Sequence, residues 1–176
     1  MRKILVSITA AFAALTVTTA ANAQTATQDI NITATVASYC TINNITGPAA
    51  LNSVIPVPLG VVNPAQILHT VASVACNNAA DVIATSVLGG VTTGGAAATG
   101  ATNIIDYTGT ASFGGATSTI NTATLATAAG AEAGNTAVTA NAATGNLVVT
   151  IDPVQPSLPL QPGAYTDTLR VTLTAH

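Results

Sequence analysis

The sequence predicts an all-β chain that folds as an antiparallel β-sandwich. Three observations support this fold class: segments with strand-like alternation of apolar and polar residues recur, proline-rich segments separate them, and two cysteines lie in the first half of the chain. Only 3% of the 176 residues are aromatic, so each core position buries little area. We therefore expect a covalent cross-link to contribute to stability.

The N-terminus has the features of a secretory signal peptide. Arg2 and Lys3 precede an apolar stretch, and Ala21-Asn22-Ala23 is a typical cleavage site. A membrane anchor is less well supported, because serines and threonines interrupt the stretch and a span requires about 20 apolar residues. We expect residues 1–23 to be removed and the mature chain, from Gln24, to be exported through the periplasm to the cell surface.

The charge of the mature chain disfavours two classes of partner. Arg170 is its only Lys or Arg, against six acidic residues. Binding to nucleic acid requires several cationic side chains that displace counterions from phosphates. Binding to anionic membranes has the same requirement. We therefore expect neither partner.

The mature chain begins with a strongly alternating segment, Gln28–Val36. The apolar residues on one face of the expected strand are Ile30, Ile32, Ala34 and Val36. Asp29, Asn31, Thr33 and Thr35 form the other face. On pattern alone, the segment suits the first strand of an ordinary sandwich.

The two cysteines, Cys40 and Cys76, both follow the predicted leader. In an oxidising compartment such a pair forms a disulfide more readily than a metal site. We expect a bridge between them, worth roughly 3.5–4 kcal/mol by the loop-entropy estimate.

Four further segments carry strand patterns. His69–Cys76 and Asp81–Leu88 flank Asn77-Asn78 and predict a hairpin. Asn146–Asp152 and Tyr165–His176 are the last two strands, with four prolines between them. In Asn103–Gly145 the pattern is weak, and we interpret it as a long connection or a weak hairpin.

The strand count indicates an immunoglobulin-like sandwich that lacks one strand. The sequence stops within its best strand, so if that strand is the sixth of seven, the closing strand is missing. An unpaired groove would expose backbone groups and core side chains, and an added strand would cover both. The alternating N-terminal segment of a neighbouring copy is a candidate for that strand.

Several motifs resemble the spore coat protein U domain family, which includes the subunits of archaic chaperone-usher pili. The resemblance rests on the leader, the alternating extension, Ala37-Ser38-Tyr39-Cys40-Thr41-Ile42, Leu59-Gly60 and Val74-Ala75-Cys76. It rests above all on the ending, Pro162-Gly163-Ala164-Tyr165-Thr166-Asp167-Thr168-Leu169-Arg170-Val171-Thr172-Leu173. The middle of the chain departs from the family's pattern.

The resemblance implies a six-stranded, incomplete immunoglobulin-like pilin. Residues 24–37 would be the donor-strand extension and residues 38–176 the pilin domain. Ile30, Ile32, Ala34 and Val36 would insert beside the aliphatic face of the last strand, Leu169, Val171 and Leu173. The implied partners are other copies of the chain, a periplasmic chaperone and an outer-membrane usher, and the implied function is a surface fibre for attachment and biofilm formation.

Enzymatic chemistry has little support in the sequence. His69 and His176 are the only imidazoles, there is no nucleophile elbow, and two isolated histidines with a cysteine pair do not make a metal site. We expect no catalytic residue, cofactor, metal or small-molecule substrate.

Tyr165 and Asp167 share a strand face, and we interpret them as a structural corner: a phenol bonded to backbone and a carboxylate that accepts from nearby amides. The alternative function is a secreted β-sandwich adhesin or carbohydrate-binding module. Such a module needs an aromatic platform, for which three Tyr and two Phe offer little material.

Overall fold

The computed structural model describes residues 32–42, 52–125 and 133–176. It divides into two units, Met1–Thr35 and Val36–His176. The predicted signal peptide and Ile30 lie outside the described residues. In the first unit the described residues, 32–35, belong to no helix or strand, and every described strand lies in the second unit.

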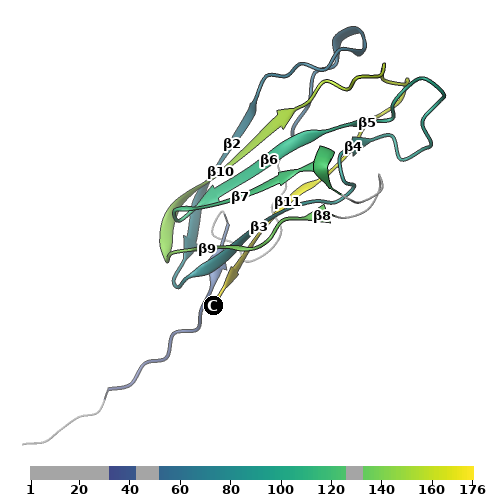
Figure 1. Ribbon diagram of the computed structural model, residues 1–176. Helices are drawn as coiled ribbons and strands as arrows, with labels where there is room; N and C mark the ends of the chain where they lie inside the picture. The colour runs from purple at the N-terminus through teal and green to yellow at the C-terminus, as the bar shows by residue number, and fades with distance from the viewer. Residues whose placement is uncertain (1–31, 43–51, 126–132) are drawn as a thin grey trace, which may run out of the picture. The chain divides into compact units, whose positions relative to one another are not determined.

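The second unit is all-β and built from antiparallel sheets (Figure 1). One sheet has five strands in the order β1-β2-β10-β6-β7, and a second has four, with β11, β8 and β9 all pairing with β3. A two-stranded sheet joins β4 and β5. The strands are β1 Cys40–Thr41, β2 Ile67–Cys76, β3 Ala80–Ser86, β4 Val91–Thr92, β5 Ile104–Ile105, β6 Tyr107–Phe113, β7 Ala116–Asn121, β8 Ala133–Gly134, β9 Val138–Ala140, β10 Ala143–Pro153 and β11 Leu169–Ala175. Two short 3-10 turns, Pro58–Gly60 and Thr122–Thr124, complete the described elements.

The two larger sheets share one hydrophobic core. Alternate residues of β3, Ala80, Val82 and Ala84, are fully buried and belong to one cluster with side chains of the five-stranded sheet. That cluster includes Val71, Val74, Ala111, Phe113, Ile120, Leu147 and Val149. The residues that β3 contributes to the core are small, and the larger core side chains, Phe113, Ile120 and Leu147, come from the five-stranded sheet.

The hairpin predicted for His69–Cys76 and Asp81–Leu88 is wrong. Both strands exist, as β2 and β3, but they belong to different sheets and do not pair. The Asn77-Asn78 connection is a corner between the sheets, because Asn77 bonds to residues before β1 and Asn78 donates to the His176 carbonyl oxygen. Asparagine favours both kinds of connection, so the residue type did not distinguish them.

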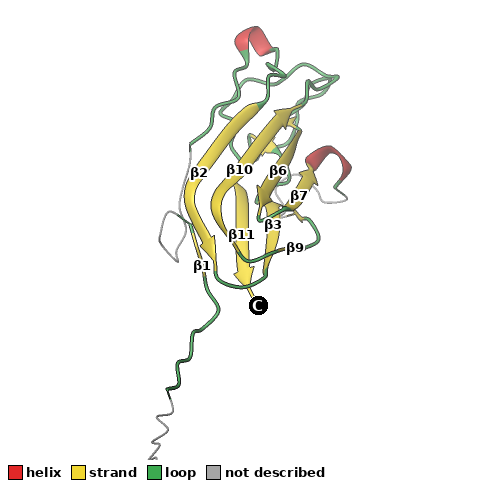
Figure 2. Ribbon diagram, turned by 90° about the vertical axis from the view of Figure 1, so that its left-hand side faces the viewer, coloured by secondary structure: helices red, strands yellow, loops and turns green. Residues whose placement is uncertain are grey.

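The weak middle region contains a well-formed hairpin of β6 and β7, seen side by side with β2 and β10 in Figure 2. Gly114 and Gly115 form its turn with φ of 56° and 84°, which glycine adopts without strain. With this hairpin and the short β8 and β9, the two larger sheets hold five and four strands, more than the six expected.

Most other predicted strands are confirmed, with shifted ends. Asn146–Asp152 lies within β10, while the last strand begins at Leu169 and not at Tyr165. Among the described residues, no helix has the length and apolar character needed to cross a membrane.

Candidate functional site: the edge of the last strand

Strand β11 carries an apolar face along the rim of the core. Leu169, Val171 and Leu173 are half-buried and pack against the core cluster, while the alternate residues, Arg170, Thr172 and Thr174, are exposed. β11 pairs with β3 from Leu169 opposite Ser86 to Ala175 opposite Ala80. Within the described part of the chain, β3 is the only strand paired along β11. Among the described residues, no strand pairs with the backbone groups on the other edge of β11, which lie beside these apolar side chains.

The first sheet has a comparable edge at β2. The short β1 covers only its last two residues, with Cys40 opposite Cys76 and Thr41 opposite Ala75. From Ile67 to Val74, no described strand pairs with that side of β2. β1 also contacts β11, so the two sheets meet beside the disulfide.

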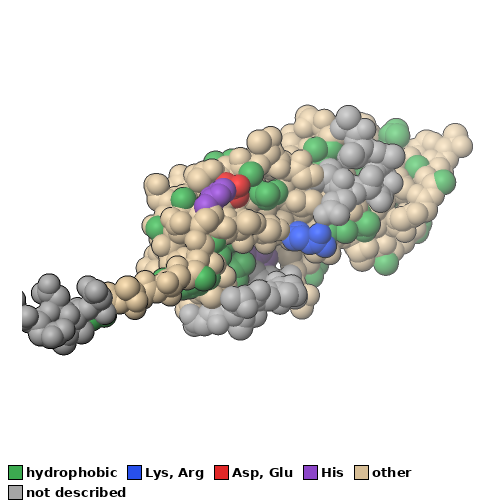
Figure 3. Space-filling model, turned by 90° about the horizontal axis from the view of Figure 1, so that it is seen from below, with side chains coloured by type: hydrophobic (Ala, Val, Ile, Leu, Met, Phe, Trp, Pro, Cys, Tyr) green, Lys and Arg blue, Asp and Glu red, His purple; other side chains and the backbone are tan. Residues whose placement is uncertain are grey.

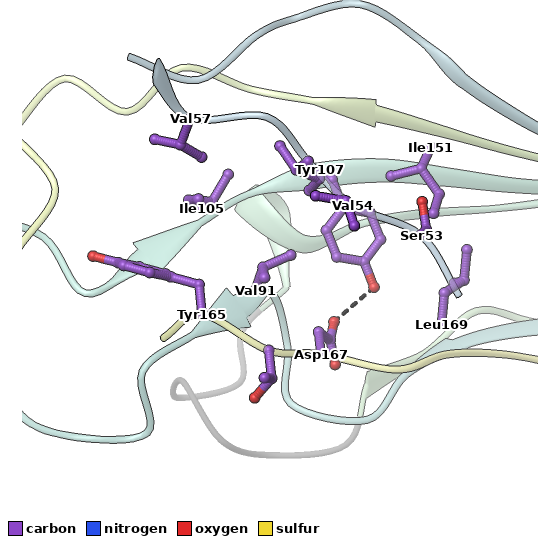
Figure 4. Close-up of a pocket in the computed structure, with 12 residues that line it drawn as sticks. Ser53, Val54, Val57, Val91, Ile105, Tyr107, Ile151, Tyr165, Asp167 and Leu169 are labelled. Atoms are coloured by element: carbon purple, nitrogen blue, oxygen red, sulfur yellow. Dashed lines mark hydrogen bonds between the residues drawn. The ribbon is translucent and has the colours of Figure 1, made fainter. Parts of the chain in front are cut away.

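A pocket of about 310 Å³ lies at the N-terminal end of β11 (Figure 4). Its lining is mainly apolar and comes from the segment before the first turn, from strands of both larger sheets and from β4 and β5. The lining residues are Ser53, Val54, Ile55, Val57, Val91, Ile105, Tyr107, Ile151, Tyr165, Thr166, Asp167 and Leu169. Leu169 thus belongs both to the exposed edge of β11 and to this pocket.

Leu169 has room in the core because residue 109 on β6 is glycine. A Cβ at Gly109 would lie 3.0 and 3.1 Å from the two terminal carbons of Leu169 and 3.2 Å from Ile120. Such distances are tighter than ordinary packing, so a larger residue would displace Leu169. The sequence Tyr107-Thr108-Gly109 therefore helps to position the apolar face of β11.

Asp167, one of the residues that line the pocket, accepts four hydrogen bonds. Its Oδ2 accepts from the Tyr107 hydroxyl at 2.7 Å and the Ser86 hydroxyl at 2.6 Å. Its Oδ1 accepts from the backbone amides of Leu88 at 2.9 Å and Thr168 at 2.7 Å. Burial raises the pKa of Tyr107 well above its ordinary value, and the adjacent Asp167 carboxylate adds to this rise, so the phenol remains a donor at neutral pH.

Tyr165 is held by backbone carbonyl groups. Its hydroxyl donates to the oxygens of Gln161 at 2.9 Å and Thr102 at 3.1 Å. Burial raises the pKa of this phenol as well. Tyr165 and Asp167 therefore both make hydrogen bonds that hold the segment leading into β11. In Figure 4, the side chain of Tyr165 extends away from Asp167.

The disulfide expected between Cys40 and Cys76 is present, with the two Cα atoms 4.2 Å apart. Next to it, Asn77 binds the chain that leads into β1. The Tyr39 amide donates to Asn77 Oδ1 at 2.8 Å, Asn77 Nδ2 donates to the Ala37 oxygen at 2.9 Å, and the Asn77 amide donates to the Tyr39 oxygen at 3.2 Å. Residues 37–39 are thus fixed to the domain.

The predicted donor residues lie at the boundary of the described chain. Ile32 and Ala34 belong to the first unit and Val36 begins the second, and all three are exposed. None of the three is part of a described strand.

The two histidines have different environments. His176 Nε2 lies 3.0 Å from Asp81 Oδ1, and this contact, with a hydrogen bond from Thr139, lowers the pKa of the carboxyl group. His69 of β2 is partly exposed, but its Nε2 is shielded from solvent and has no hydrogen-bond partner among the described residues. Over the same residues, no three His, Cys, Asp or Glu side chains gather as a metal site would require.

Sequence reasoning missed three members of this site: Tyr107, Ser86 and Asn77. Tyr107 and Ser86 are 60 and 81 residues from Asp167, so no local spacing links them. Asn77 was identified as a turn residue, but its bonds to Ala37 and Tyr39 join positions far apart in sequence.

The fold and the site define an all-β protein with antiparallel sheets, one disulfide and an unpaired apolar edge in its described part. Comparisons with protein-family models, with curated proteins and with solved structures give no match.

Proposed function

We propose that the chain is a structural subunit of a surface fibre that assembles by donor-strand exchange. The observation that carries the proposal is the outer edge of β11, where Leu169, Val171 and Leu173 line an unpaired edge in the described part of the chain. An extended segment with apolar residues at every second position is the ligand that such an edge accepts. Gln28–Val36 of another copy has this pattern.

The energy of insertion is sufficient for a stable joint. At about 1.5–3 kcal/mol for each large side chain, burying Ile30, Ile32, Ala34 and Val36 contributes on the order of 5–8 kcal/mol. Backbone hydrogen bonds along β11 add to this. In this proposal the domain is an incomplete immunoglobulin-like sandwich, and the inserted strand completes it.

The proposal includes a periplasmic chaperone and an outer-membrane usher as assembly partners, with the fibre serving attachment and biofilm formation. Its support is the resemblance of the leader, the extension and the last strand to pilus subunits. A secreted carbohydrate-binding module is less well supported, because the hydroxyls of Tyr107 and Tyr165 and both oxygens of Asp167 are already engaged within the domain.

A self-complemented variant tests the proposal. A second copy of Gln28–Val36, attached after His176 through a long flexible linker, should fill the edge of β11 in the same molecule. We expect a higher unfolding temperature than that of the mature chain, and no polymerisation. The control carries Ile30→Asp and Ile32→Asp in the added copy only. Equal unfolding temperatures for the two fusions would show that the edge does not bind this segment.

A further inference from the structure

Three loops at one end of the domain form an uncharged apolar surface, which we call the loop end: residues 52–66, 93–103 and 153–164. None of these residues is Asp, Glu, Lys, Arg or His. Large apolar side chains are exposed on the first and third loops, namely Val54, Leu59, Val61, Val154 and Leu158. Leu59 is fully exposed at the tip of the Pro58–Gly60 turn, with φ of 53°.

The loop end is built as a fixed surface. The Val62 amide donates to the Gln155 side chain at 2.6 Å, and Thr102 exchanges backbone hydrogen bonds of 2.9 Å with Pro159 and Gln161. Seven prolines in the first and third loops further restrict the backbone. An uncharged apolar surface held in one shape is typical of a contact that is buried in an assembly.

The opposite end carries the disulfide, residues 37–39 with Asn77, and the C-terminus; we call it the clamp pole. The His176 amide donates to Ala79 at 3.0 Å, which ties the end of β11 to the corner after Asn77. Figure 2 shows the C-terminus and β1 at this end and the Pro58–Gly60 turn at the other. The side chains of Asp81 and His176 contact each other. Figure 3 views the domain from this end and shows an acidic side chain beside a histidine. The exposed ring of Tyr39 adds an apolar group.

Within one chain, no linker residues separate the donor strand from the clamp pole. Val36 is the last apolar residue of the extension, and the next residue, Ala37, is already bonded to Asn77. If Val36 is buried in one copy, the clamp pole of the next copy must lie directly against the end of the groove from which the strand emerges.

The direction of the inserted strand decides which end of the groove this is. β11 runs from Leu169, beside the loop end, to Ala175, at the clamp pole. Every pairing between named strands in the described residues is antiparallel. A donor that continues this pattern runs from the clamp pole to the loop end, so Val36 emerges beside the loop end.

We propose that the loop end of one copy is the docking surface for the clamp pole of the next copy in the fibre. This inference rests on the proposed function. Each joint then has two parts, the inserted strand and an end-to-end contact in which Leu59 and its apolar neighbours are covered.

The direction of insertion is tested with two fusions that carry Gln28–Val36 after His176. A linker of about four residues reaches about 14 Å, which allows the added strand to turn back antiparallel to β11. Parallel insertion has to start at Leu169, about 20 Å away along β11, and needs a longer linker. We expect the short and long linkers to give the same rise in unfolding temperature. A rise with the long linker alone would overturn the docking inference and leave donor-strand exchange standing.

The contact itself is tested in assembled fibres by a photo-cross-linking residue, p-benzoylphenylalanine, at Leu59. Cross-linked peptides should join position 59 of one copy to residues 36–39 or 76–79 of another. The same group at Thr117, exposed on β7, is the control and should give none of these peptides. Fibres in which position 59 cross-links to no other copy, or to other segments only, would overturn the inference. A wild-type chain that never enters a fibre would reject the proposed function, and this inference with it.

Discussion

The Tyr107 hydroxyl donates a 2.7 Å hydrogen bond to Asp167, and this bond joins the two larger sheets at the start of the last strand. Tyr107 begins β6 of the five-stranded sheet, and Asp167 lies two residues before β11 of the other. Ser86 of β3 donates to the same carboxylate oxygen. Since Leu169 begins β11 two residues after Asp167, this network positions the apolar edge to which we assign function.

Asp167→Asn should destabilise the domain by about 1–3 kcal/mol, because the amide nitrogen cannot accept the hydrogen bonds that Oδ1 or Oδ2 now accepts. The loss should appear as a lower midpoint in urea unfolding with little change in slope. Asp152→Asn is the matched control, since its carboxylate accepts only an exposed bond from Gln66 among the hydrogen bonds described. That control should shift stability by less than about 0.5 kcal/mol. Equal effects of the two substitutions would contradict a structural role for Asp167.

Alkaline pH should destabilise the domain through Tyr107. Burial, reinforced by Asp167, raises the pKa of its phenol above the ordinary value of 10.0 in the folded state. The folded chain therefore holds this proton where the unfolded chain loses it. The resulting stability is complete below about pH 10 and is lost as pH rises from there toward the folded pKa.

Urea unfolding at a series of alkaline pH values measures this effect. Tyr107→Phe should reduce the loss of stability above pH 10, although Tyr165, whose pKa is also raised by burial, still contributes. The absorbance of tyrosinate provides an independent check, since ionisation of Tyr107 should coincide with unfolding. A variant with the same pH dependence as the wild type would rule out this contribution of Tyr107.

Removing the disulfide should cost roughly 3.5–4 kcal/mol by the loop-entropy estimate, since the two cysteines are 36 residues apart. The double substitution Cys40→Ala with Cys76→Ala avoids a free thiol. Because the whole stability of a domain is about 5–15 kcal/mol, we expect this chain to accumulate poorly and to unfold at a much lower urea concentration. Thr41→Ala, next to Cys40 on β1, is the control and should cost far less. Two free thiols in the wild-type chain, found by mass spectrometry, would contradict the bridge.

The strands that sequence predicts best are those with strong side-chain contrast. β11 alternates leucine or valine with arginine or threonine, so its period of two is visible, and β2, β3 and β10 each carry several valine, leucine or isoleucine residues. β6 and β7 alternate alanine, glycine, serine and threonine, whose hydropathies differ little, although Gly114-Gly115 is a hairpin signal. The local sequence pattern therefore predicts only a long connection or a weak hairpin here, whereas tertiary packing forms a hairpin whose side chains belong to the core.

The candidate site shows the same limit. Tyr165, Asp167 and the aliphatic residues of the last strand were identified from one short segment. The partners that hold this segment come from β3, β6 and the loop around Thr102, and one sequence without co-varying relatives does not reveal such pairs. The Asn77-Asn78 corner was misassigned for a related reason, since a hairpin and a crossing between sheets use the same turn residues.

The extension provides the test that separates a donor strand from the domain's own first strand. Ile32 is 90% exposed and lies outside any described strand, so we expect Ile32→Asp to leave the subunit folded and able to bind the periplasmic chaperone that the proposed function includes. The same substitution should block fibre formation, because an unpaired carboxylate in an apolar groove costs several kcal/mol, comparable to the gain from the inserted side chains. Asn31→Asp places the same charge on the opposite face of the segment, where it stays near water, and should allow fibres to form.

Two measurements on both variants distinguish these roles: co-purification with the proposed chaperone, and the yield of fibres. A donor strand predicts that Ile32→Asp retains the chaperone complex and loses the fibre, while Asn31→Asp retains both. If the segment instead completes the sheet of its own domain, Ile32→Asp introduces the charge into that domain's core and both complex and fibre disappear. Because the two substitutions add the same charge at adjacent positions, a difference between them depends on which face of the strand is buried, and not on the change in net charge.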